Sequence, residues 1–455
     1  MAFEVKGKRV MVCGMARSGI AAAKLLCELG AHVTISDLKT ESAFEGALSF
    51  LHDMDCVFAL GEKPDAYIAQ QDIMVISPGI PWAKDFVQSA IAQGVEVIGE
   101  LELGARLSRG VLCAITGTNG KTTTTTLVGE LLRAAGHTTH VVGNIGYPIT
   151  ATAGISTDSD RTVAEVSSYQ CEGISMFYPH VGAVLNITED HLARHGDMQT
   201  YIAMKRRIFS NQTQQDYAVF NYDDLTCREM AQGLAARIVW FSRKEAVPCG
   251  AYVKDGQIVF CLDGREQTVC AADEVFIPGP HNLENALAAV AITGVMGVAP
   301  QTMRHVLRTF AGVEHRIETV RTIDSVTWIN DSKGTNVDST LKAIDTMTKP
   351  TVLILGGSDK KTSFAPLAQA IAAAPQIMHC VLIGDTAEQI REALAQAGYE
   401  RVSMAGYDFD ACLALCREKA VEGGCVLLSP ACTSFDMFKD YEDRGRIFKE
   451  KVTAL

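Results

Sequence analysis

A glycine-rich turn at residues 117–122, with the sequence GTNGKT, has the residue types of a phosphate-binding loop. It follows an apolar run at residues 111–115, typical of a buried strand, and it precedes a helical pattern at residues 123–135. Backbone N–H groups at such a helix start point at a bound anion, and the helix dipole favours negative charge there. Lys121 would reach the outer phosphates of a nucleotide, and the Thr122 hydroxyl would ligate Mg²⁺.

The spacing of this loop differs from that of the common nucleoside triphosphatases. Their pattern has a glycine five residues before the Gly-Lys pair, where this chain has Ile115. Here the first glycine, Gly117, lies three residues before Gly120. The segment therefore predicts a phosphate loop of a different kind from theirs.

Three side chains further along the chain are candidates for metal chemistry. A bound nucleoside triphosphate needs Mg²⁺, which prefers oxygen ligands and usually takes one or two carboxylates. Glu165 ends an apolar strand pattern, where a glutamate is uncommon unless something pairs with it. His191, in the segment TEDH, is either a structural residue or a metal ligand. Lys205, on a predicted helix beside two arginines, is by residue type an ordinary solvated lysine.

The first hundred residues contain a second anion-binding pattern. The turn at residues 14–19, GMARSG, resembles the dinucleotide fingerprint, with Ala16 in place of the second glycine. Asp37 lies near the distance at which an acidic residue would hold a ribose, and Ser77 closes a later strand at the edge where ligands bind. A nucleotide diphosphate is the favoured ligand, with NAD as the alternative.

The last third of the chain places charged and hydroxyl side chains at predicted strand ends. Asp331 could hold a ribose or a base, while Arg316 and Lys333 could clamp a phosphate or a carboxylate. The segment SPACTS at residues 429–434 ends a strand and opens a helix, which is another anion-favouring position. Its Cys432 has no partner histidine placed by the sequence, so a buried thiol is favoured over a nucleophile.

The composition indicates a globular protein of about three domains. The 455 residues are enough for three cores, and the 47% apolar and 21% charged residues are ordinary values. The net charge of −12, without a basic stretch, argues against a nucleic-acid partner. Residues 1–9 hold no apolar signal segment, and no apolar run approaches membrane-spanning length. We therefore predict a cytoplasmic protein with no membrane insertion.

The fourteen cysteines form no Cys-x-x-Cys pair, and most lie in apolar runs such as residues 10–13 and 425–428. This usage fits reduced, buried thiols in a cytosolic protein better than a disulfide framework or a zinc site.

Short apolar runs alternate with helical segments along the whole chain, which predicts the α/β class with mainly parallel, doubly wound sheets. The pattern divides into three blocks, at residues 1–99, 100–310 and 311–455. Within the second block, residues 252–261 and 267–271 are typical of a hairpin.

Taken together, these motifs resemble those of the Mur ligases. The matching segments are GTNGKT at 117–122, EVSSYQ at 165–170, the Asn186-x-x-x-Asp190-His191 pattern, the position of Lys205, HN-x-x-N at 281–285 and His315-Arg316. Their order and spacing cover nearly the whole chain. The resemblance implies three domains: an N-terminal Rossmann-like domain for a UDP-linked substrate, a central P-loop ATPase-like domain and a C-terminal Rossmann-like domain.

The resemblance also implies an activity: ATP-dependent, ADP-forming amide synthesis through an acyl phosphate. The segments NDSKGTN at 330–336 and LSPACTSFD at 428–436 resemble the branch that adds D-glutamate to UDP-N-acetylmuramoyl-L-alanine during peptidoglycan precursor synthesis. A monomer is expected. The alternatives are a Mur ligase that adds another amino acid, a folylpolyglutamate-synthetase-like ligase, and a nucleotide-binding protein that has lost catalysis.

The resemblance assigns roles to individual residues. Catalysis would use Lys121, Glu165, His191 and Lys205. ATP would contact Gly117, Thr118, Asn119, Gly120, Lys121, Thr122, Asn282, Asn285, Arg316 and Asp331. The UDP-linked substrate would contact Ser18, Asp37, Ser77, Asn144, Ser167, Gln170 and His191. D-glutamate would contact Lys333, Thr335, Lys360, Ser434 and Tyr441.

Two Mg²⁺ sites are implied as well, one at Thr122 and Glu165 and one at His191 and a carbamylated Lys205. The chain departs from the family at Gly334, where alanine is common, and at Tyr441, where some members have phenylalanine. The sequence leaves open whether Lys360 or Lys361 meets the D-glutamate carboxylate.

Overall fold

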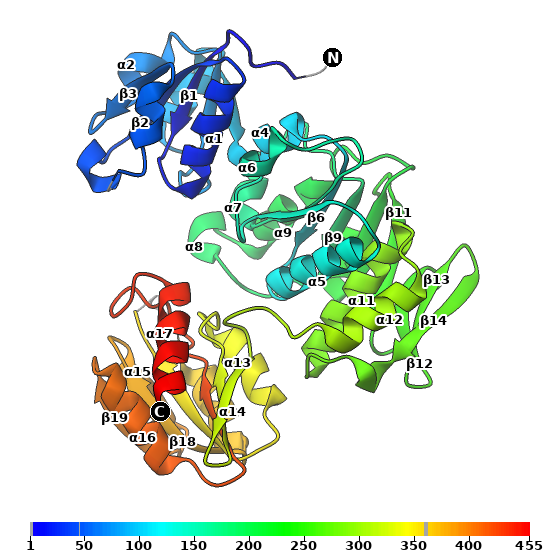
Figure 1. Cartoon of the computed structure of the whole chain (residues 1–455), viewed down its shortest axis with the longest axis vertical. Coiled ribbons are helices and arrows are strands. Elements are labelled where there is room, and N and C mark those ends of the chain that lie inside the picture. The colour runs from blue at the N-terminus through cyan, green and yellow to red at the C-terminus, as the bar shows by residue number, and fades with distance from the viewer. Residues whose placement is uncertain (1–2, 45, 359–362) are drawn as a thin grey trace. The chain divides into compact units, whose positions relative to one another are not determined.

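Three mainly parallel β-sheets with helices packed on them make up the protein in a computed structural model that describes residues 3–44, 46–358 and 363–455 (Figure 1). By its internal contacts the chain divides into two compact units, residues 1–275 with 284–309 and residues 276–283 with 310–455. The first unit contains two of the sheets and the second unit contains the third. The predicted α/β class with three mainly parallel sheets is confirmed.

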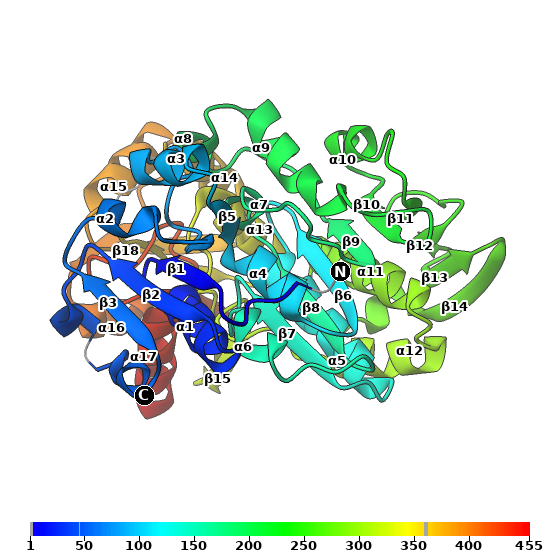
Figure 2. The ribbon, with the colours of Figure 1, turned by 90° about the horizontal axis from the view of Figure 1, so that it is seen from above.

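The N-terminal sheet has five parallel strands in the order β3-β2-β1-β4-β5. Alternate residues of β1 face opposite sides: Val10 and Val12 pack in one apolar cluster with α1, whereas Met11 and Cys13 pack in another with α3. Figure 2 shows β3, β2 and β1 side by side. The elements are β1 (Arg9–Cys13), α1 (Arg17–Glu28), β2 (His32–Asp37), β3 (Cys56–Leu60), α2 (Asp65–Ile68), β4 (Ile73–Ile76), α3 (Asp85–Ala92), β5 (Glu96–Gly99) and α4 (Glu100–Leu107).

The central sheet has nine strands in the order β14-β13-β12-β11-β10-β9-β6-β8-β7. Strands β6 to β12 run parallel to one another, and β13 and β14 add an antiparallel edge next to β12. The strands are β6 (Val111–Thr116), β7 (Thr139–Gly143), β8 (Arg161–Glu165), β9 (Val181–Val184), β10 (Tyr217–Asn221), β11 (Arg237–Ser242), β12 (Gly250–Lys254), β13 (Gln257–Leu262) and β14 (Arg265–Ala271). The helices are α5 (Lys121–Ala134), α6 (Thr150–Ala153), α7 (Ser168–Cys171), α8 (Leu192–His195), α9 (Met198–Arg206), α10 (Leu225–Met230), α11 (Pro280–Val295) and α12 (Pro300–Thr309).

The predicted hairpin in this sheet is a three-stranded meander. Residues 252–261 do not form one strand, because Asp255 and Gly256 both have positive φ, 50° and 73°, and turn the chain between β12 and β13. The short apolar runs on the two sides of this turn therefore pair with each other before β14 adds to the edge.

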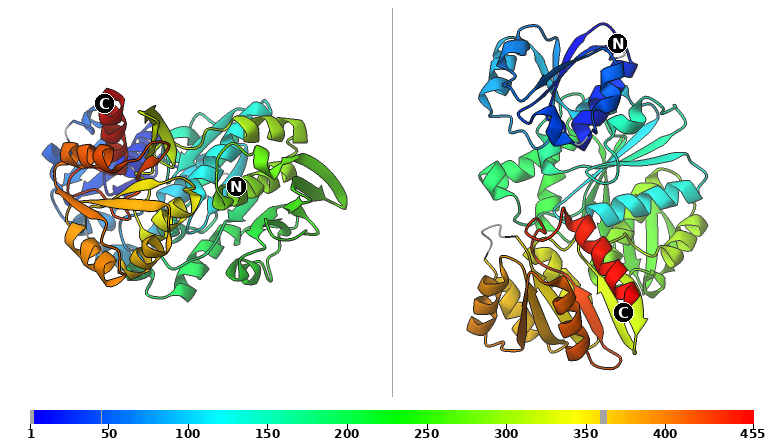
Figure 3. Two further views of the ribbon diagram at one scale, coloured as in Figure 1. Left: turned by 90° about the horizontal axis from the view of Figure 1, so that it is seen from below. Right: turned by 60° about the vertical axis from the view of Figure 1, so that its left-hand side comes forward.

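The C-terminal sheet has six strands in the order β15-β16-β20-β17-β18-β19, all parallel except β15 at the edge. Leu353 and Leu355 of β17 pack with α13, α14 and α15, whereas Val352 and Ile354 pack with α16 and α17. Figure 3 shows the strands between these helix layers. The elements are β15 (Glu318–Ile323), β16 (Val326–Asn330), α13 (Val337–Thr346), β17 (Thr351–Gly356), α14 (Ala365–Ala373), β18 (Ile377–Ile383), α15 (Ala387–Gln396), β19 (Val402–Gly406), α16 (Phe409–Lys419), β20 (Cys425–Leu428) and α17 (Tyr441–Ala454).

The close approach of α1 to the turn after β1 predicts that Gly19→Ala destabilises the N-terminal sheet. A Cβ atom at Gly19 would lie 1.9 Å from the Gly14 carbonyl oxygen, and backbone cannot yield as a side-chain end can. We expect a loss of about 1–3 kcal/mol in the free energy of opening, measured by hydrogen exchange of the β1 amides.

Gly79→Ala is the matched control in the same domain, because a Cβ atom there has no neighbour within 4 Å. Its cost should stay within about 0.5 kcal/mol. Equal losses for the two variants would contradict the packing argument.

Candidate active site

The phosphate loop joins the end of β6 to the start of α5, as the sequence predicts. Gly120 precedes the helix with φ 83°, a conformation that side chains rarely adopt. A Cβ atom at this position would lie 2.2 Å from Asn285 Oδ1, so the loop approaches α11 as closely as only glycine allows. Asn285 also accepts a hydrogen bond from Thr124 Oγ1 at 3.3 Å, so this predicted ATP residue lies against the start of the loop helix.

The parallel pairing of three strands brings the predicted catalytic segments to this loop. Strand β6 lies between β8 and β9, with Ile115 opposite Glu165 and Thr116 opposite Val184. The carboxyl ends of parallel strands share one edge of the sheet, and ligands of α/β proteins bind outside that edge. Glu165 and the segment that follows Val184 therefore flank the phosphate loop.

Asn186 and Thr118 hold the loop in place. The Asn186 side chain accepts from Asn119 N at 2.9 Å and donates to Asn119 O at 3.0 Å. Thr118 Oγ1 donates to Thr188 O at 3.1 Å and accepts from Thr188 N at 3.0 Å, and it lies 3.1 Å from the Tyr201 hydroxyl. The loop is thus clamped to the segment after β9. The sequence contained the Asn186 signal only as part of a motif and contained no signal for Tyr201.

Lys121 lies close over its own loop. Its Nζ donates to Gly117 O at 3.1 Å and to Thr118 O at 2.8 Å. The ammonium group is therefore at the mouth of the loop, next to the backbone N–H groups that open α5.

Lys205 is buried, so the residue-type expectation of a solvated lysine is wrong. Its side chain is 1% exposed, and its Nζ donates to Gly117 O at 2.8 Å. Burial, followed by the nearby positive charge of Lys121, lowers the pKa of Lys205 to about 7. This end of α9 faces the phosphate loop, where the arginines beside Lys205 had suggested a solvated face. Burial of this kind leaves much of the amine neutral near pH 7.

Glu165 is buried with one oxygen unsatisfied. Asn144 Nδ2 donates to its Oε1 at 2.8 Å, whereas its Oε2 has no hydrogen-bond partner among the described residues. Asn144, predicted to contact the UDP-linked substrate, is thus a direct neighbour of the predicted metal ligand. A buried carboxylate oxygen without a partner is costly unless a cation or a donor completes it, so Glu165 fits a Mg²⁺ ligand.

His191 lies on a strained segment beside an aromatic ring. Its backbone has φ 55°, its Nδ1 lies 3.1 Å from the Tyr169 hydroxyl, and its Nε2 lies 3.4 Å from Asp190 Oδ2. Within the part of the chain that the structure describes, no group of three or more His, Cys, Asp and Glu side chains could hold a metal ion. A Mg²⁺ ion held by Glu165 would therefore complete its shell with hydroxyl, phosphate or water oxygens.

The predicted substrate residues Ser167 and Gln170 bind each other at the start of α7. Gln170 N donates to Ser167 Oγ, and the Gln170 side chain accepts from Ser167 N, which is a capping box. Both are thereby positioned directly after Glu165 and Val166.

The N-terminal turn has the strand–turn–helix arrangement that its sequence predicts. Ser77 Oγ donates to Gly14 O at 2.7 Å, which ties the ends of β4 and β1 together. Asp37 accepts from Met15 N at 2.8 Å, so its carboxylate supports the turn. Ser18 lies in the first turn of α1 and is partly exposed. The strand order changes direction between β1 and β4, the place where such sheets bind ligands.

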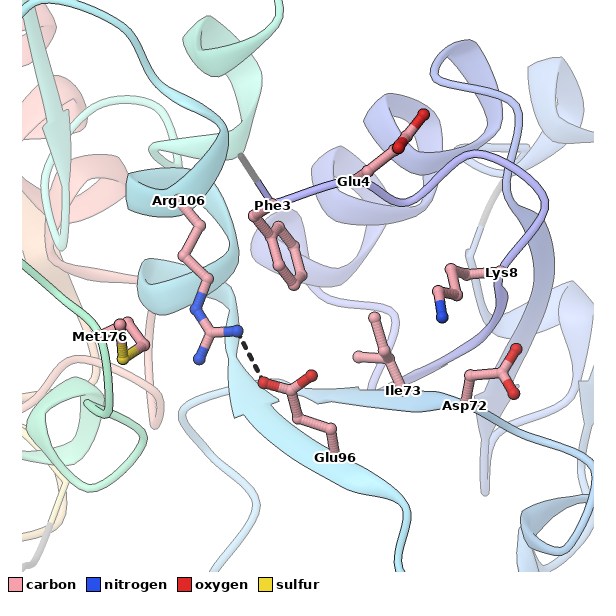
Figure 4. Close-up of a pocket in the computed structure, with 8 residues that line it drawn as sticks. All are labelled: Phe3, Glu4, Lys8, Asp72, Ile73, Glu96, Arg106 and Met176. Atoms are coloured by element: carbon pink, nitrogen blue, oxygen red, sulfur yellow. Dashed lines mark hydrogen bonds and ion pairs between the residues drawn. The ribbon is translucent and has the colours of Figure 1, made fainter. Parts of the chain in front are cut away.

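A pocket of about 600 Å³ lies at the opposite edge of this sheet (Figure 4). Lys8, Ile73 and Glu96 line it, and Ile73 and Glu96 are the first residues of their strands. Arg106 reaches across to Glu96 at 2.6 Å, so its charge is balanced inside the pocket. The pocket is therefore separate from the carboxyl-end edge that holds the predicted substrate residues.

In the second unit, Asp331 is fully buried at the end of β16. Ser429 Oγ donates to its Oδ2 at 2.7 Å, and Ile317 N donates to its Oδ1 at 3.3 Å. Burial raises the pKa of Asp331 to about 6, although the Arg316 charge opposes this. Arg316 lies between two residues of positive φ, and its buried Nε has no partner among the described residues.

Two of the predicted D-glutamate residues, Lys333 and Tyr441, lie next to each other at the start of α17. Lys333 Nζ lies 3.4 Å from the Tyr441 hydroxyl and 5.2 Å from the centre of its ring. Ser434 is buried, and Thr335 is partly exposed. Lys360 and Lys361 lie outside the described residues.

Arg444 is a positioning residue that the sequence did not single out. It is fully buried and donates to Ser332 Oγ at 2.9 Å, to Ser332 O at 2.7 Å and to Cys432 O at 3.2 Å. It thus joins the two C-terminal motifs. The predicted buried thiol at Cys432 is confirmed, since that residue is 3% exposed.

Asn282, the remaining predicted ATP residue, lies in the first turn of α11. Its Nδ2 donates to Pro278 O at 2.7 Å. The side chain therefore fastens the start of this helix to the segment before it.

Three family models and full-length relatives match this chain along nearly its whole length. Residues 8–99 match the MurD-like N-terminal domain of the Mur ligases, residues 115–293 the Mur ligase middle domain, and residues 315–432 the Mur ligase glutamate ligase domain. The UDP-N-acetylmuramoylalanine–D-glutamate ligase of Alkaliphilus oremlandii is 44% identical over 453 residues, which cover 99% of each chain. The protein of the same name from Pelotomaculum thermopropionicum is 44% identical over 448 residues, 98% of each chain.

The chain belongs to the Mur ligase family. Enzymes of this family use ATP and Mg²⁺. Residues 8–99 match an N-terminal domain of this family, so the first block of the chain has a counterpart in other Mur ligases. This match argues against the folylpolyglutamate-synthetase alternative.

Solved structures support the fold. The UDP-N-acetylmuramate–alanine ligase of Thermotoga maritima matches with a TM-score of 0.62 at 18% identity, covering 98% of this chain and 99% of that one. MurF of Acinetobacter baumannii matches with a TM-score of 0.63 at 17% identity, covering 98% and 93%. In the described part of this Mur ligase, no helix is long and apolar enough to cross a membrane.

The environment of Asp331 predicts a pH-dependent stability of the C-terminal sheet. Its folded-state pKa of about 6 lies above the value of about 3.9 expected for an unfolded chain, so the folded form binds the proton more tightly. The free energy of unfolding should fall as the pH rises from about 4 to about 6 and stay lower above that.

Asp331→Asn should remove this dependence and raise that free energy at pH 7.5, by at most about 3 kcal/mol. Hydrogen exchange of the β16 amides measures it. Asp324→Asn, at a carboxylate that is 74% exposed in the same unit, is the control. A less stable Asp331→Asn protein at pH 7.5 would contradict the prediction.

Proposed function

We propose that this Mur ligase adds D-glutamate to UDP-N-acetylmuramoyl-L-alanine with ATP, in the cytoplasmic stage of peptidoglycan precursor synthesis. The observation that carries the proposal is the full-length, 44% identity to relatives named for this reaction, combined with a phosphate loop flanked by buried Glu165 and Lys205. The enzyme would act as an ADP-forming acid–D-amino-acid ligase, and we expect a monomer.

The first step would be phosphorylation of the substrate carboxylate. The loop from Gly117 to Thr122 would hold the β- and γ-phosphates of ATP, with Lys121 as the cation that balances charge on the transferred group. The alanyl carboxylate would attack the γ-phosphorus, the bond to the β-phosphate oxygen would break, and ADP would leave. Asn282, Asn285, Arg316 and Asp331 would hold the adenine nucleotide.

The second step would form the amide bond. The D-glutamate amine would attack the acyl carbon of the acyl phosphate, and inorganic phosphate would leave with the bonding electrons. Lys333, Thr335, Lys360, Ser434 and Tyr441 would hold D-glutamate. The cation at Lys333, held beside the Tyr441 ring, suits one of the two carboxylates of this amino acid.

Mg²⁺ would be held by Thr122 and Glu165, with a second ion at His191 and Lys205. The unpartnered Oε2 of Glu165 supports the first of these sites. When bound, Mg²⁺ neutralises phosphate charge that would otherwise repel the attacking carboxylate.

Lys205 would carry a carbamate. A buried ammonium group cannot ligate a cation, whereas a carbamate offers oxygen ligands. Formation of a carbamate requires a neutral amine, and the burial of Lys205 beside Lys121 favours that form. The same burial would protect the product from water.

The UDP-linked substrate would lie along the carboxyl ends of the N-terminal sheet and reach the phosphate loop. Ser18, Asp37 and Ser77 would contact its nucleotide end. Asn144, Ser167, Gln170 and His191 would contact its acceptor end, beside Glu165.

Phosphate release should require ATP, Mg²⁺, UDP-N-acetylmuramoyl-L-alanine and D-glutamate together. A panel with D-glutamate, L-alanine, L-lysine and meso-diaminopimelate, each added to the other three components, tests this. Of these four amino acids, only D-glutamate should support turnover. Turnover with one of the other amino acids instead would refute the assignment.

Lys121→Ala should lose about 10²–10³-fold in kcat, because it removes a charge that stabilises the transferred phosphoryl group.

Lys205→Ala should lose most activity and regain part of it with acetate or formate. A small carboxylate can occupy the space of the missing carbamate and supply its oxygen ligands. Lys121→Ala is the matched control: it should not recover, because a carboxylate cannot replace a cation. If acetate and formate leave Lys205→Ala inactive while the unchanged enzyme is indifferent to bicarbonate depletion, the carbamate is ruled out.

A further inference from the structure

Two cysteines of the N-terminal domain meet sulfur to sulfur. Cys27 lies in the last turn of α1, and Cys56 is the first residue of β3. Their Sγ atoms are 2.9 Å apart, and 29 positions separate them in the chain. A disulfide bond is about 2.05 Å long, so the two sulfurs are already close to bonding distance.

These two thiols are also more accessible than most others in the protein. All fourteen cysteines are free, and eleven of them are buried. Cys27 and Cys56 are partly exposed, as is Cys249. A small oxidant can therefore reach this pair from solvent, whereas it cannot reach the buried thiols without local opening.

The backbone around the pair is already fixed. Helix α1 packs on β1 and β2, and Cys56 pairs with Val33 in the parallel ladder between β2 and β3. Both cysteines pack against the same apolar cluster on this face of the sheet. Bond formation therefore needs side-chain rotation and no rearrangement of strands.

The hydrogen bond between the thiols makes their reactivities unequal. The contact between the two Sγ atoms, in which either thiol could be the donor, lowers the pKa of Cys56 although burial and the Asp55 charge oppose the effect. The same bond, together with burial, raises the pKa of Cys27. Since the thiolate is the nucleophile, Cys56 attacks first and Cys27 follows.

We propose that Cys27 and Cys56 form a dithiol site that hydrogen peroxide oxidises to a disulfide. The Cys56 thiolate attacks one peroxide oxygen, the O–O bond breaks, and the departing hydroxide leaves as water after taking a proton. Cys27 then attacks the sulfur of the Cys56 sulfenic acid, the S–O bond breaks, and a second water leaves. The two sulfurs together lose two electrons and the peroxide gains them. The product links the end of α1 to the start of β3.

The test uses the full chain and hydrogen peroxide at a few equivalents. Intact mass should fall by about 2 Da, for the two hydrogens lost, before any oxygen is added. Alkylation followed by trypsin separates the cysteines, because cleavage after Lys24, Lys39 and Lys84 gives peptides 25–39 and 40–84 with one cysteine each. These two peptides should appear joined, and the joined species should disappear after reduction.

Single variants test the order of attack. In Cys27→Ser, a dimedone-type reagent should trap a sulfenic acid on Cys56, since the resolving thiol is missing. In Cys56→Ser, labelling of Cys27 should be at least tenfold weaker. Cys249→Ser, at the other partly exposed cysteine, is the matched control and should keep the full yield of the 27–56 link. Native hydrogen exchange of the β1 amides verifies that each variant is folded.

Three results would overturn the proposal. The first is a folded protein whose peptides 25–39 and 40–84 stay separate after peroxide. The second is a link that forms between molecules and disappears on dilution. The third is oxidation of Cys249 as fast as that of Cys56, which would show that solvent exposure, and not the contact with Cys27, determines the rate of oxidation.

Discussion

The parallel pairing of β6 between β8 and β9 is the constraint on which the catalytic centre depends. The ladder fixes Glu165 opposite Ile115 and brings the segment after Val184 to the same edge. The phosphate loop cannot stand alone, because it takes its shape from Asn186 and Thr188, which this register delivers. A slip of one residue between these strands would reverse their faces and separate all three parts.

Burial of ionisable side chains is the second organising feature, and it shifts the pKa in opposite directions for a lysine in one unit and an aspartate in the other. Beside the phosphate loop, desolvation makes the Lys205 amine easier to deprotonate. At the end of β16, desolvation makes the Asp331 carboxyl harder to deprotonate. In both cases the apolar sheet beneath the residue drives the group toward its neutral form. Reactive groups are thus prepared by the packing of the sheets as well as by their immediate neighbours.

The sequence predicted the strand positions, the phosphate loop and the motif segments, because short apolar runs and glycine-rich turns carry local signals. It did not predict the burial of Lys205 or Arg444, since both lie among other charged residues on helices and only the tertiary packing buries them. The hairpin predicted from residues 252–261 and 267–271 is present between β13 and β14, but its first strand was predicted too long, because a turn at Asp255 and Gly256 divides residues 252–261 into two strands. The assignment of residues to substrates came from family resemblance, and these assignments stay predictions.

The hydrogen bonds of Lys121 have a consequence for ligand discrimination. Its ammonium group donates to two carbonyl oxygens of its own loop. A ligand that recruits this lysine must replace those acceptors, so a neutral hydroxyl or amide would gain little by the exchange. A phosphate oxygen, with its full negative charge, gains a stronger bond than the carbonyls offered. The hydrogen bonds that Lys121 makes within the loop therefore favour ligands whose oxygens carry more negative charge than the two carbonyl oxygens they replace.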